Sequence, residues 1–329
     1  MEFRKLGRTG LKVSTICLGT MQFGWSADEP TSHSIMSRAI ELGCNFFDTA
    51  DVYSRWVDGN DGGVSEQIIG NWLAKSGVRR QSVVLATKVR GQMGDGPNDQ
   101  GLSRAHIMTA VEDSLRRLQT EYIDLYQVHW PDEETPLDET LSALTDLVRA
   151  GKVRYIGCSN YPAWLLTKAL WISDVKHLVR YDSLQPHYSL VHRAEFEREL
   201  QPLCLDQGIG VIPYSPLAGG FLTGKYRRDT PLPASTRAEG VRSRYMNEQG
   251  FTAVDTLEVI GKSHNATIAQ TAIAWVLANT AVSSAIIGAN SVAQLEDTVQ
   301  GASVTLMPEE KEALDKTTAW QEGKWQKFS

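Results

Sequence analysis

The segment IDLYQVHWPDEETPLDETLSALTDLVRAGKVRYIGCSN, residues 123–160, contains the unit that decides the fold. Two short apolar runs, 123–129 and 153–160, flank a stretch from Leu137 to Ala150 that has the apolar spacing of an amphipathic helix. Strands joined through a helix lie parallel, because a parallel pair needs a long crossover connection. The segment therefore predicts a strand–helix–strand unit of a parallel sheet.

The same alternation recurs along nearly the whole chain. The predicted strands are 14–20, 44–49, 82–88, 123–129, 153–160, 181–186, 208–215 and 283–289. The predicted helices are 31–42 with Thr31 or Ser32 as cap, 64–75 with Ser65 as cap, one opening at Ser103, 137–150, one from Pro162, 192–207, 253–263, 267–279, 291–301 and 308–317. Eight strands, each followed by a helix, predict a single-domain (β/α)₈ barrel over residues 1–329, with extra C-terminal helices. Residues 3–13 predict an N-terminal β-hairpin at one end of the barrel.

A doubly wound dinucleotide fold is the main competitor, and its glycine signature is missing. That fold carries G-x-G-x-x-G between its first strand and helix, and no such run occurs. The stretch GGFLTGKY (219–226) contains G-x-x-x-x-G-K, but Tyr226 stands where a phosphate loop needs Ser or Thr for Mg²⁺. We interpret it as a false phosphate loop.

Composition and charge restrict the class of partner. A net charge of -6 and a pI near 5.7 argue against binding to nucleic acid or to an anionic membrane surface. The four widely spaced cysteines, Cys17, Cys44, Cys158 and Cys204, are expected to pack in the core. The start has no apolar signal region and no run approaches the length of a membrane helix, so a cytoplasmic protein is expected.

Polar residues at the ends of neighbouring strands indicate a chemical site. Asp48 ends the second predicted strand, Lys88 the third and His129 the fourth, and Tyr53 follows Asp48 on a loop. Each alone has a structural explanation, such as a loop cap, a snorkelling lysine, a core histidine or a packed ring. Together they gather at the C-terminal mouth of the barrel, where such folds carry their chemistry.

The chemistry of these four residues is coherent. A neighbouring Lys88 ammonium lowers the pKa of Tyr53, which makes the phenol usable for general acid–base work. Asp48 holds Lys88 by an ion pair, and His129 orients a carbonyl group. No nucleophile beside the histidine, no second carboxylate and no companion metal ligands are found, which disfavours a hydrolase, a glycosidase or a metal site. The set suggests carbonyl reduction with a hydride from a nicotinamide.

The chain resembles the aldo-keto reductases, in particular their larger bacterial members, which are also similar to the β-subunits of voltage-gated potassium channels. The resemblance rests on LGRTGLKVS (6–14), NFFDTADVYS (45–54), LATK (85–88), YIDLYQVHWPD (122–132), GKVRYIGCSN (151–160), LQPHYSL (184–190), IPYSPLAGGFLTGKY (212–226) and AIIGANSVAQLED (285–297). It implies a (β/α)₈ barrel whose catalytic residues are Asp48, Tyr53, Lys88 and His129.

The resemblance also implies the cofactor contacts. Ser159, Asn160 and Gln185 match residues around the nicotinamide carboxamide, and Tyr214 matches the ring that stacks on the nicotinamide. The loop 215–225, with Ser215, Leu217, Gly219 and Lys225, resembles the cover of the pyrophosphate, and Gly288, Asn290, Gln294 and Asp297 fall in the adenosine-phosphate segment. Many relatives have Lys or Arg in place of Asn290, and Glu-Asn in place of Asp297 and Thr298, so NAD(H) stays an alternative to NADP(H).

A basic segment nevertheless favours NADP(H). Between residues 225 and 244, Asp229 and Glu239 are outnumbered by basic residues, which are Lys225, Arg227, Arg228, Arg237, Arg242 and Arg244. A solvated face is the alternative interpretation. Barrel loops after strands 7 and 8 often bind phosphate, so the segment is a candidate for the cofactor phosphates. The resemblance to the channel subunits, which place basic residues at matching positions, implies Lys225 and Arg237 as the individual contacts.

The resulting expectation is an NADP(H)-dependent oxidoreductase that reduces an aldehyde or ketone, or oxidises the matching alcohol. Trp25, Trp56 and Trp130 lie in loops at the mouth and form either a substrate wall for sugar or aryl groups or loop packing. The C-terminal WQEGKWQKFS (320–329) either folds over the mouth or frays. A cofactor-binding regulatory subunit is the alternative, disfavoured because the chain begins at the barrel hairpin; a homo-oligomer is compatible with either.

Overall fold

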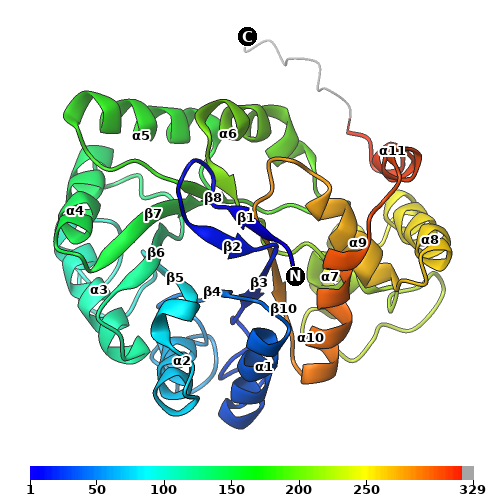
Figure 1. Ribbon diagram of the computed structural model, residues 1–329, viewed down its shortest axis with the longest axis horizontal. Helices are drawn as coiled ribbons and strands as arrows, with labels where there is room; N and C mark the ends of the chain where they lie inside the picture. The colour runs from blue at the N-terminus through cyan, green and yellow to red at the C-terminus, as the bar shows by residue number, and fades with distance from the viewer. Residues whose placement is uncertain (321–329) are drawn as a thin grey trace.

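The computed structural model describes residues 1–320, and its centre is an eight-stranded parallel sheet. The strand order is β10-β3-β4-β5-β6-β7-β8-β9. The bounds are β3 (Ile16–Gly19), β4 (Phe46–Asp48), β5 (Val84–Val89), β6 (Ile123–Val128), β7 (Val153–Ser159), β8 (Ser183–Gln185), β9 (Gly210–Val211) and β10 (Ala285–Gly288). The backbone N–H of Ser283 donates to Val211 O at 2.8 Å, which joins the two edges of the sheet. The predicted (β/α)₈ barrel is confirmed, with the strands inside a ring of helices (Figure 1).

The helices follow the strands as the sequence predicts, with differences at their ends. They are α1 (Glu29–Glu41), α2 (Val64–Lys75), α3 (Arg104–Leu118), α4 (Leu137–Arg149), α5 (Ala163–Lys176), α6 (Gln201–Gln207), α7 (Ala238–Tyr245), α8 (Glu248–Ser263), α9 (Ile268–Leu277), α10 (Val292–Val299) and α11 (Pro308–Thr317). Shorter helical turns are η1 (Arg80–Ser82), η2 (Phe196–Leu200), η3 (Ala218–Thr223) and η4 (Gln300–Ser303). Helix α7 was not predicted.

Two predicted helix caps are wrong. Helix α1 begins one turn earlier, because the carboxylate of Asp28 accepts from the backbone N–H of Thr31 at 2.9 Å. Helix α2 follows Gly63 without a side-chain cap, and the hydroxyl of Ser65 instead donates to Thr20 O at 2.9 Å. The predicted helix start at Ser103 is confirmed, and Ser103 is its cap, since its side chain accepts from the backbone N–H of His106.

The N-terminal hairpin closes one end of the barrel. Strands β1 (Phe3–Lys5) and β2 (Lys12–Ser14) pair antiparallel, as predicted, and lie across the centre of the ring (Figure 1). Gly7, in the left-handed region at φ +57, rests on the first residue of β9: a Cβ there would meet Gly210 N at 2.4 Å. The hairpin therefore covers the N-terminal ends of the strands, and the C-terminal ends remain for a site.

Alternation along the strands separates an inner core from an outer one. The barrel interior is filled by Leu6, Val13, Cys17, Phe46, Val84, Ala86, Leu125, Ile212 and Ile286. The intervening residues, such as Phe47, Leu85 and Tyr126, pack against the helices. Because side chains point the same way every second residue, the positions two residues after Phe46, Ala86 and Leu125 form the next inward layer. That layer is polar, which places a site above the inner core.

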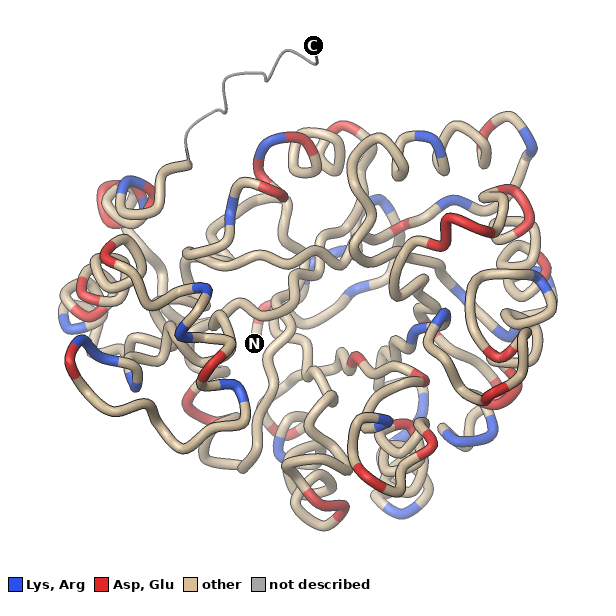
Figure 2. Tube along the Cα trace, turned by 180° about the vertical axis from the view of Figure 1, so that it is seen from behind, with Lys and Arg blue, Asp and Glu red and all other residues tan. Residues whose placement is uncertain are grey.

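The remaining surface and core features are ordinary. All four cysteines are free and buried, as predicted. Lys and Arg positions are interspersed with Asp and Glu positions over the outer helices and loops (Figure 2). Within residues 1–320, no helix combines the length and apolar character needed to cross a membrane.

Candidate active site

A cavity of about 780 Å³ opens at the C-terminal ends of the strands. It is lined by nearly all the residues proposed from the sequence, namely Trp25, Asp48, Tyr53, His129, Trp130, Ser159, Asn160, Gln185, Tyr214, Ser215, Leu217, Gly219, Lys225, Arg237, Gly288, Asn290, Gln294 and Asp297. Lys88 lies beneath the floor, and Trp56 stands outside the lining. Segments distant in the sequence thus contribute to one cavity.

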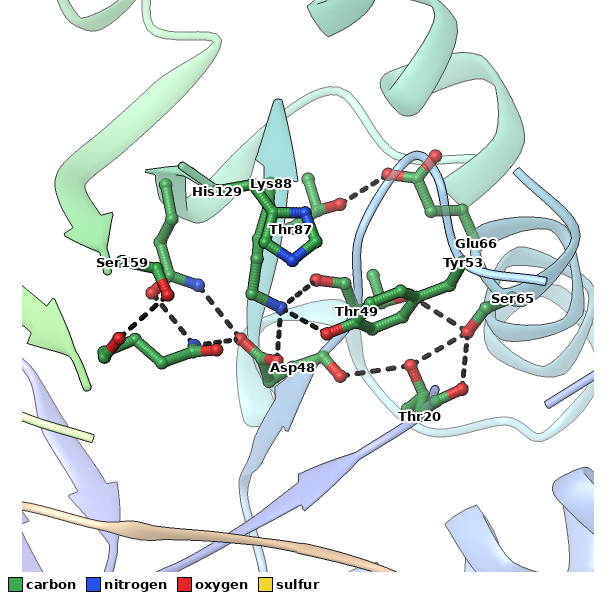
Figure 3. Close-up of polar contacts among 12 residues, drawn as sticks. Thr20, Asp48, Thr49, Tyr53, Ser65, Glu66, Thr87, Lys88, His129 and Ser159 are labelled. Carbon is green, nitrogen blue, oxygen red and sulfur yellow. Dashed lines mark hydrogen bonds and ion pairs between the residues drawn. The ribbon is translucent and has the colours of Figure 1, made fainter. Parts of the chain in front are cut away.

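Lys88 is fully buried, and its ammonium finds three acceptors. Its Nζ donates to Asp48 Oδ2 at 2.5 Å, to Thr49 O at 2.7 Å and to the hydroxyl of Tyr53 at 3.0 Å (Figure 3). Burial by itself lowers the pKa of Lys88, but Asp48 and Tyr53 outweigh it and raise that pKa above its ordinary value. The ammonium is therefore a fixed positive charge beneath the phenol.

The expectation that the pKa of Tyr53 is lowered is wrong for the protein without ligand. Burial raises this pKa above its ordinary value, while the positive charge of Lys88 opposes the rise. Lys88 acts in the predicted direction, but desolvation of the phenolate is the larger effect. Tyr53 is consequently a neutral phenol near pH 7, the form that can donate a proton.

His129 closes the other side of the phenol with a neutral ring. Its ring lies edge-on to Tyr53, with 5.8 Å between the ring centroids. Burial, together with the charges of Lys88 and Arg90, lowers the pKa of His129 to about 3. A neutral imidazole has one N–H donor and one acceptor, so it is able to hydrogen-bond a carbonyl oxygen next to Tyr53.

Two buried amides hold the free oxygen of Asp48, and one of them was missed in the sequence. Gln127 Nε2 and Gln185 Nε2 each donate to Asp48 Oδ1 at 2.9 Å, and Gln185 Nε2 also lies 3.2 Å from Gln127 Oε1. Gln127 belongs to β6, two residues after the inward-facing Leu125. The alternation of strand residues was the signal that could have identified it.

Ser159, Asn160 and Tyr214 continue the polar floor. The hydroxyl of Ser159 donates to Gln185 O at 2.8 Å, and Asn160 Nδ2 donates to His129 O at 3.0 Å. Tyr214 donates to Asn160 Oδ1 at 2.9 Å, and its ring is stacked on His187 with a centroid distance of 5.1 Å. These contacts fix a flat aromatic wall beside a set of amide groups.

The far part of the cavity combines glycine turns with cations. Gly219 and Gly220 have positive φ angles, and a Cβ on Gly220 would lie 3.2 Å from Lys225 Nζ. Lys225 and Arg237 are the cations among the lining residues. The other basic residues of the segment differ: Arg227, for example, pairs with Glu258 at 3.0 Å.

The residues predicted for the adenosine segment are held by hydrogen bonds to one another and to neighbouring segments. Asn290 Oδ1 accepts from the hydroxyl of Ser26 at 2.7 Å, and the backbone N–H of Asn290 donates to Gln294 Oε1 at 2.9 Å. The Asp297 carboxylate accepts from Gln270 Nε2 at 2.7 Å. No formal positive charge is contributed by these three segment residues.

The three tryptophans predicted for the substrate wall are placed differently. Trp25 and Trp130 line the cavity. Trp56 packs edge-on against Trp25 at 5.7 Å and against Tyr53 at 6.2 Å between centroids, so it supports the wall from behind. Arg237 lies over the ring of Trp25 at 5.7 Å and links the segment after β9 to the loop after β3.

The predicted C-terminal segment is described only at its first residue. Trp320 Nε1 donates to Glu197 Oε2 at 2.8 Å. The rest of the segment, 321–329, lies outside the described residues.

Comparisons with known proteins place this geometry in context. The model of the Aldo/keto reductase family matches residues 15–319. The "Uncharacterized oxidoreductase YrpG" of Bacillus subtilis is 43% identical over 311 residues, covering 93% of this chain and 92% of the relative. A "Probable voltage-gated potassium channel subunit beta" of Arabidopsis thaliana is 36% identical over 310 residues, 92% of each chain. The "Versiconal hemiacetal acetate reductase" of Aspergillus parasiticus is 36% identical over 341 residues, 96% of each chain.

Proposed function

The chain belongs to the aldo/keto reductase family of oxidoreductases, and from this we propose that it interconverts an aldehyde or ketone and the matching alcohol with a nicotinamide cofactor, Tyr53 being the proton donor. The observation that carries the proposal is the contact of 3.0 Å between Lys88 Nζ and the hydroxyl of Tyr53, in a cavity that His129 also lines. A neutral phenol and a neutral imidazole both donate to an oxygen placed between them.

The residues present fit a nicotinamide dinucleotide. When bound, the cofactor supplies the hydride. Ser159, Asn160 and Gln185 offer amide and hydroxyl groups for a carboxamide, and Tyr214 offers a ring face. The glycine turn at 219–220, where the absence of side chains leaves the backbone open, suits phosphate groups.

In this proposal the residues of the chain divide the work. Tyr53 donates its hydroxyl proton to the carbonyl oxygen as that oxygen becomes an alkoxide, and takes it back in alcohol oxidation. Lys88 stabilises the phenolate that remains, because its ammonium is held against the phenol oxygen. His129 fixes the carbonyl oxygen through a ring N–H, and Asp48 keeps Lys88 in place.

We favour NADP(H) over NAD(H). Lys225 and Arg237 line the cavity and form no ion pair with any residue of the described chain, so both charges are available to phosphate groups. Asn290 and Asp297 argue the other way, since neither adds a positive charge. The aromatic wall of Trp25 and Trp130 favours a substrate with an aryl or sugar ring next to the carbonyl.

A steady-state assay tests the function. NADPH oxidation is followed at 340 nm with 4-nitrobenzaldehyde and with a simple sugar aldehyde, beside the same assay with NADH. Many turnovers per protein molecule are expected. A regulatory subunit is the second candidate, favoured by the similarity to a probable potassium-channel subunit; tight NADPH binding without turnover of any carbonyl compound would support it and sink the enzymatic proposal.

A further inference from the structure

Gln127 occupies a position where an amide is costly unless both of its ends are bonded. It is fully buried in the barrel and pairs in register with Lys88 on the neighbouring strand. Its Nε2 donates to Asp48 Oδ1 at 2.9 Å and its Oε1 accepts from Gln185 Nε2 at 3.2 Å. A buried polar group without partners destabilises the folded state. Here both halves of the amide are used, so the side chain has one favoured orientation.

The charge on Asp48 determines how both amides are turned. An ionised carboxylate only accepts hydrogen bonds. Asp48 Oδ2 is taken by Lys88, and Oδ1 accepts the NH₂ groups of Gln127 and Gln185 together. Since the NH₂ group of Gln185 is directed at Asp48 and Gln127, its carbonyl oxygen is the end left for a ligand in the cavity that Gln185 lines.

We propose that Gln127 is a positioning residue of the reaction, which locks Asp48 under Lys88 and sets Gln185 to present an acceptor to the cavity. This inference rests on the proposed function. Hydrogen bonds then connect the acid–base side of the cavity to its amide side in one continuous chain. The members in order are Tyr53, Lys88, Asp48, Gln127 with Gln185, Ser159, Asn160 and Tyr214.

An apolar residue at position 127 removes one of the two links between Asp48 and Gln185, and leaves only their direct hydrogen bond. Asp48 Oδ1 then keeps one donor, and the NH₂ group of Gln185 keeps one of its two acceptors. Both changes let Asp48 and Lys88 move relative to Tyr53, so they reduce the rate of the chemical step more than the binding of a carbonyl substrate. Loss of a hydrogen bond to a charged group corresponds to about 10-fold or more.

Two variants of similar size test the proposal. Gln127→Met removes both hydrogen bonds, and kcat is expected to fall about 10-fold or more at every pH while KM for the carbonyl changes less than about threefold. Gln127→Glu keeps a donor only while the new carboxyl is protonated, and burial beside Asp48 raises the pKa of that group. Its kcat is expected to approach the wild-type value at acid pH and to decline as pH rises. This decline is expected to be missing from the pH profile of Gln127→Met.

A readout without turnover accompanies the kinetics. In the protein without cofactor, the melting temperature of Gln127→Glu is expected to decrease relative to wild type as pH rises, because a carboxyl with a raised pKa stabilises the fold only below that pKa. Tyr126→Phe is the matched control: it changes the preceding residue of β6, which faces the helices. Its kcat, pH profile and melting temperature profile are expected to follow wild type.

The outcomes separate the two proposals. Wild-type kcat and pH profiles in both Gln127 variants overturn the positioning role, as does a Gln127→Glu melting profile that matches wild type across the pH range. If Gln127→Met does not fold, Gln127→Glu at acid pH still decides. A wild type that turns over no carbonyl compound contradicts the proposed function, and the melting profile then remains the test of the Gln127–Asp48 contact.

Discussion

At the scale of single residues, Lys88 shows how a costly burial becomes useful. A fully buried ammonium is tolerated because Asp48, Thr49 and Tyr53 satisfy its three N–H groups. The same contacts determine the proton chemistry of Tyr53. Burial raises the pKa of its phenol, and the positive charge of Lys88 opposes that rise. A change at Tyr53 therefore tests the transferable proton, and a change at Lys88 tests the positive charge that stabilises the phenolate.

Replacing Tyr53 with Phe removes the transferable proton and keeps the ring. We expect kcat for carbonyl reduction to fall at least ~10²-fold, the lower range for general acid–base catalysis. NADPH affinity, measured by quenching of tryptophan fluorescence, should change little. A variant that retains more than half of the wild-type kcat would show that another group donates the proton.

Replacing Lys88 with Met tests the electrostatic role. The phenolate of Tyr53 loses its nearest positive charge, so the apparent pKa that governs alcohol oxidation is expected to rise. The measurement is kcat/KM for an alcohol substrate across pH, with circular dichroism to establish that the variant folds. Lys168→Met, at an exposed position of α5, is the control. An active Lys88 variant with an unchanged pH profile excludes Lys88 from the mechanism.

At the scale of elements, strand periodicity explains both what the sequence predicts and what it misses. Asp48 and Lys88 were found because each is a charged residue at the C-terminal end of an apolar run: Asp48 ends β4, and Lys88 is the last residue but one of β5. Gln127 sits within β6 and is neutral, so only its place in the inward series after Leu125 identifies it. The carboxylate orientation that makes Gln127 matter depends on contacts between strands, which spacing along the chain does not determine.

Helix ends and the segment after β9 limit prediction for a different physical reason. Helix α7 is short and polar, so it has no strong apolar period, and it lies in the basic segment that was interpreted only by charge. Helix α8 begins at Glu248 rather than at residue 253, because the side chain of Asn247 caps it by accepting from the N–H of Gly250. Capping side chains and hydrophobic periodicity can indicate different starting residues for a helix, and the sequence alone did not show which of the two would decide.

The segment after β9 also carries the test of cofactor preference. Lys225→Ala and Arg237→Ala are each expected to weaken NADPH binding about 10- to 150-fold, the range for a charge-assisted contact. Arg227→Ala is the matched control, since this arginine pairs with Glu258 in the same segment. Dissociation constants for NADPH and NADH are compared in each protein.

The pattern of losses identifies the phosphate involved. A larger loss for NADPH than for NADH places the removed charge near the 2′-phosphate. Equal losses restrict the residue to the shared pyrophosphate at most. A wild type that binds NADH as tightly as NADPH contradicts the preference for NADP(H), whatever the two variants do.

At the scale of the whole molecule, apolar packing lies towards the N-terminal end of the barrel and the candidate site lies at its C-terminal end. The hairpin seals the N-terminal end over an apolar interior, in which Leu6 and Val13 pack. The C-terminal end buries polar groups that contribute to the site at a cost to the free energy of unfolding. Among these are histidines held neutral, so the acid sensitivity of the fold should originate at the mouth of the barrel.

His187 allows that sensitivity to be measured. It stacks on Tyr214 and His192, and burial, with the charges of His192 and Arg244, lowers its pKa to about 3. In the unfolded chain a histidine takes up a proton near pH 6.5, so the unfolded state binds more protons between about pH 6.5 and pH 3. The stability that His187 contributes is complete above this window and is lost as pH falls through it, at most about 1.4 kcal/mol per pH unit.

We therefore expect the free energy of unfolding of the cofactor-free protein, measured by urea titration, to decrease less steeply on acidification in His187→Gln than in wild type. Subtracting the two curves removes the contributions of other titrating groups, which both proteins share. His177→Gln, at an exposed position after α5, is the control and should parallel wild type, because that ring meets solvent in the folded and unfolded states alike. Identical slopes for His187→Gln and wild type between pH 6.5 and pH 4 would mean that His187 accepts its proton in the folded barrel, and that the stacked rings behind Tyr214 open to water.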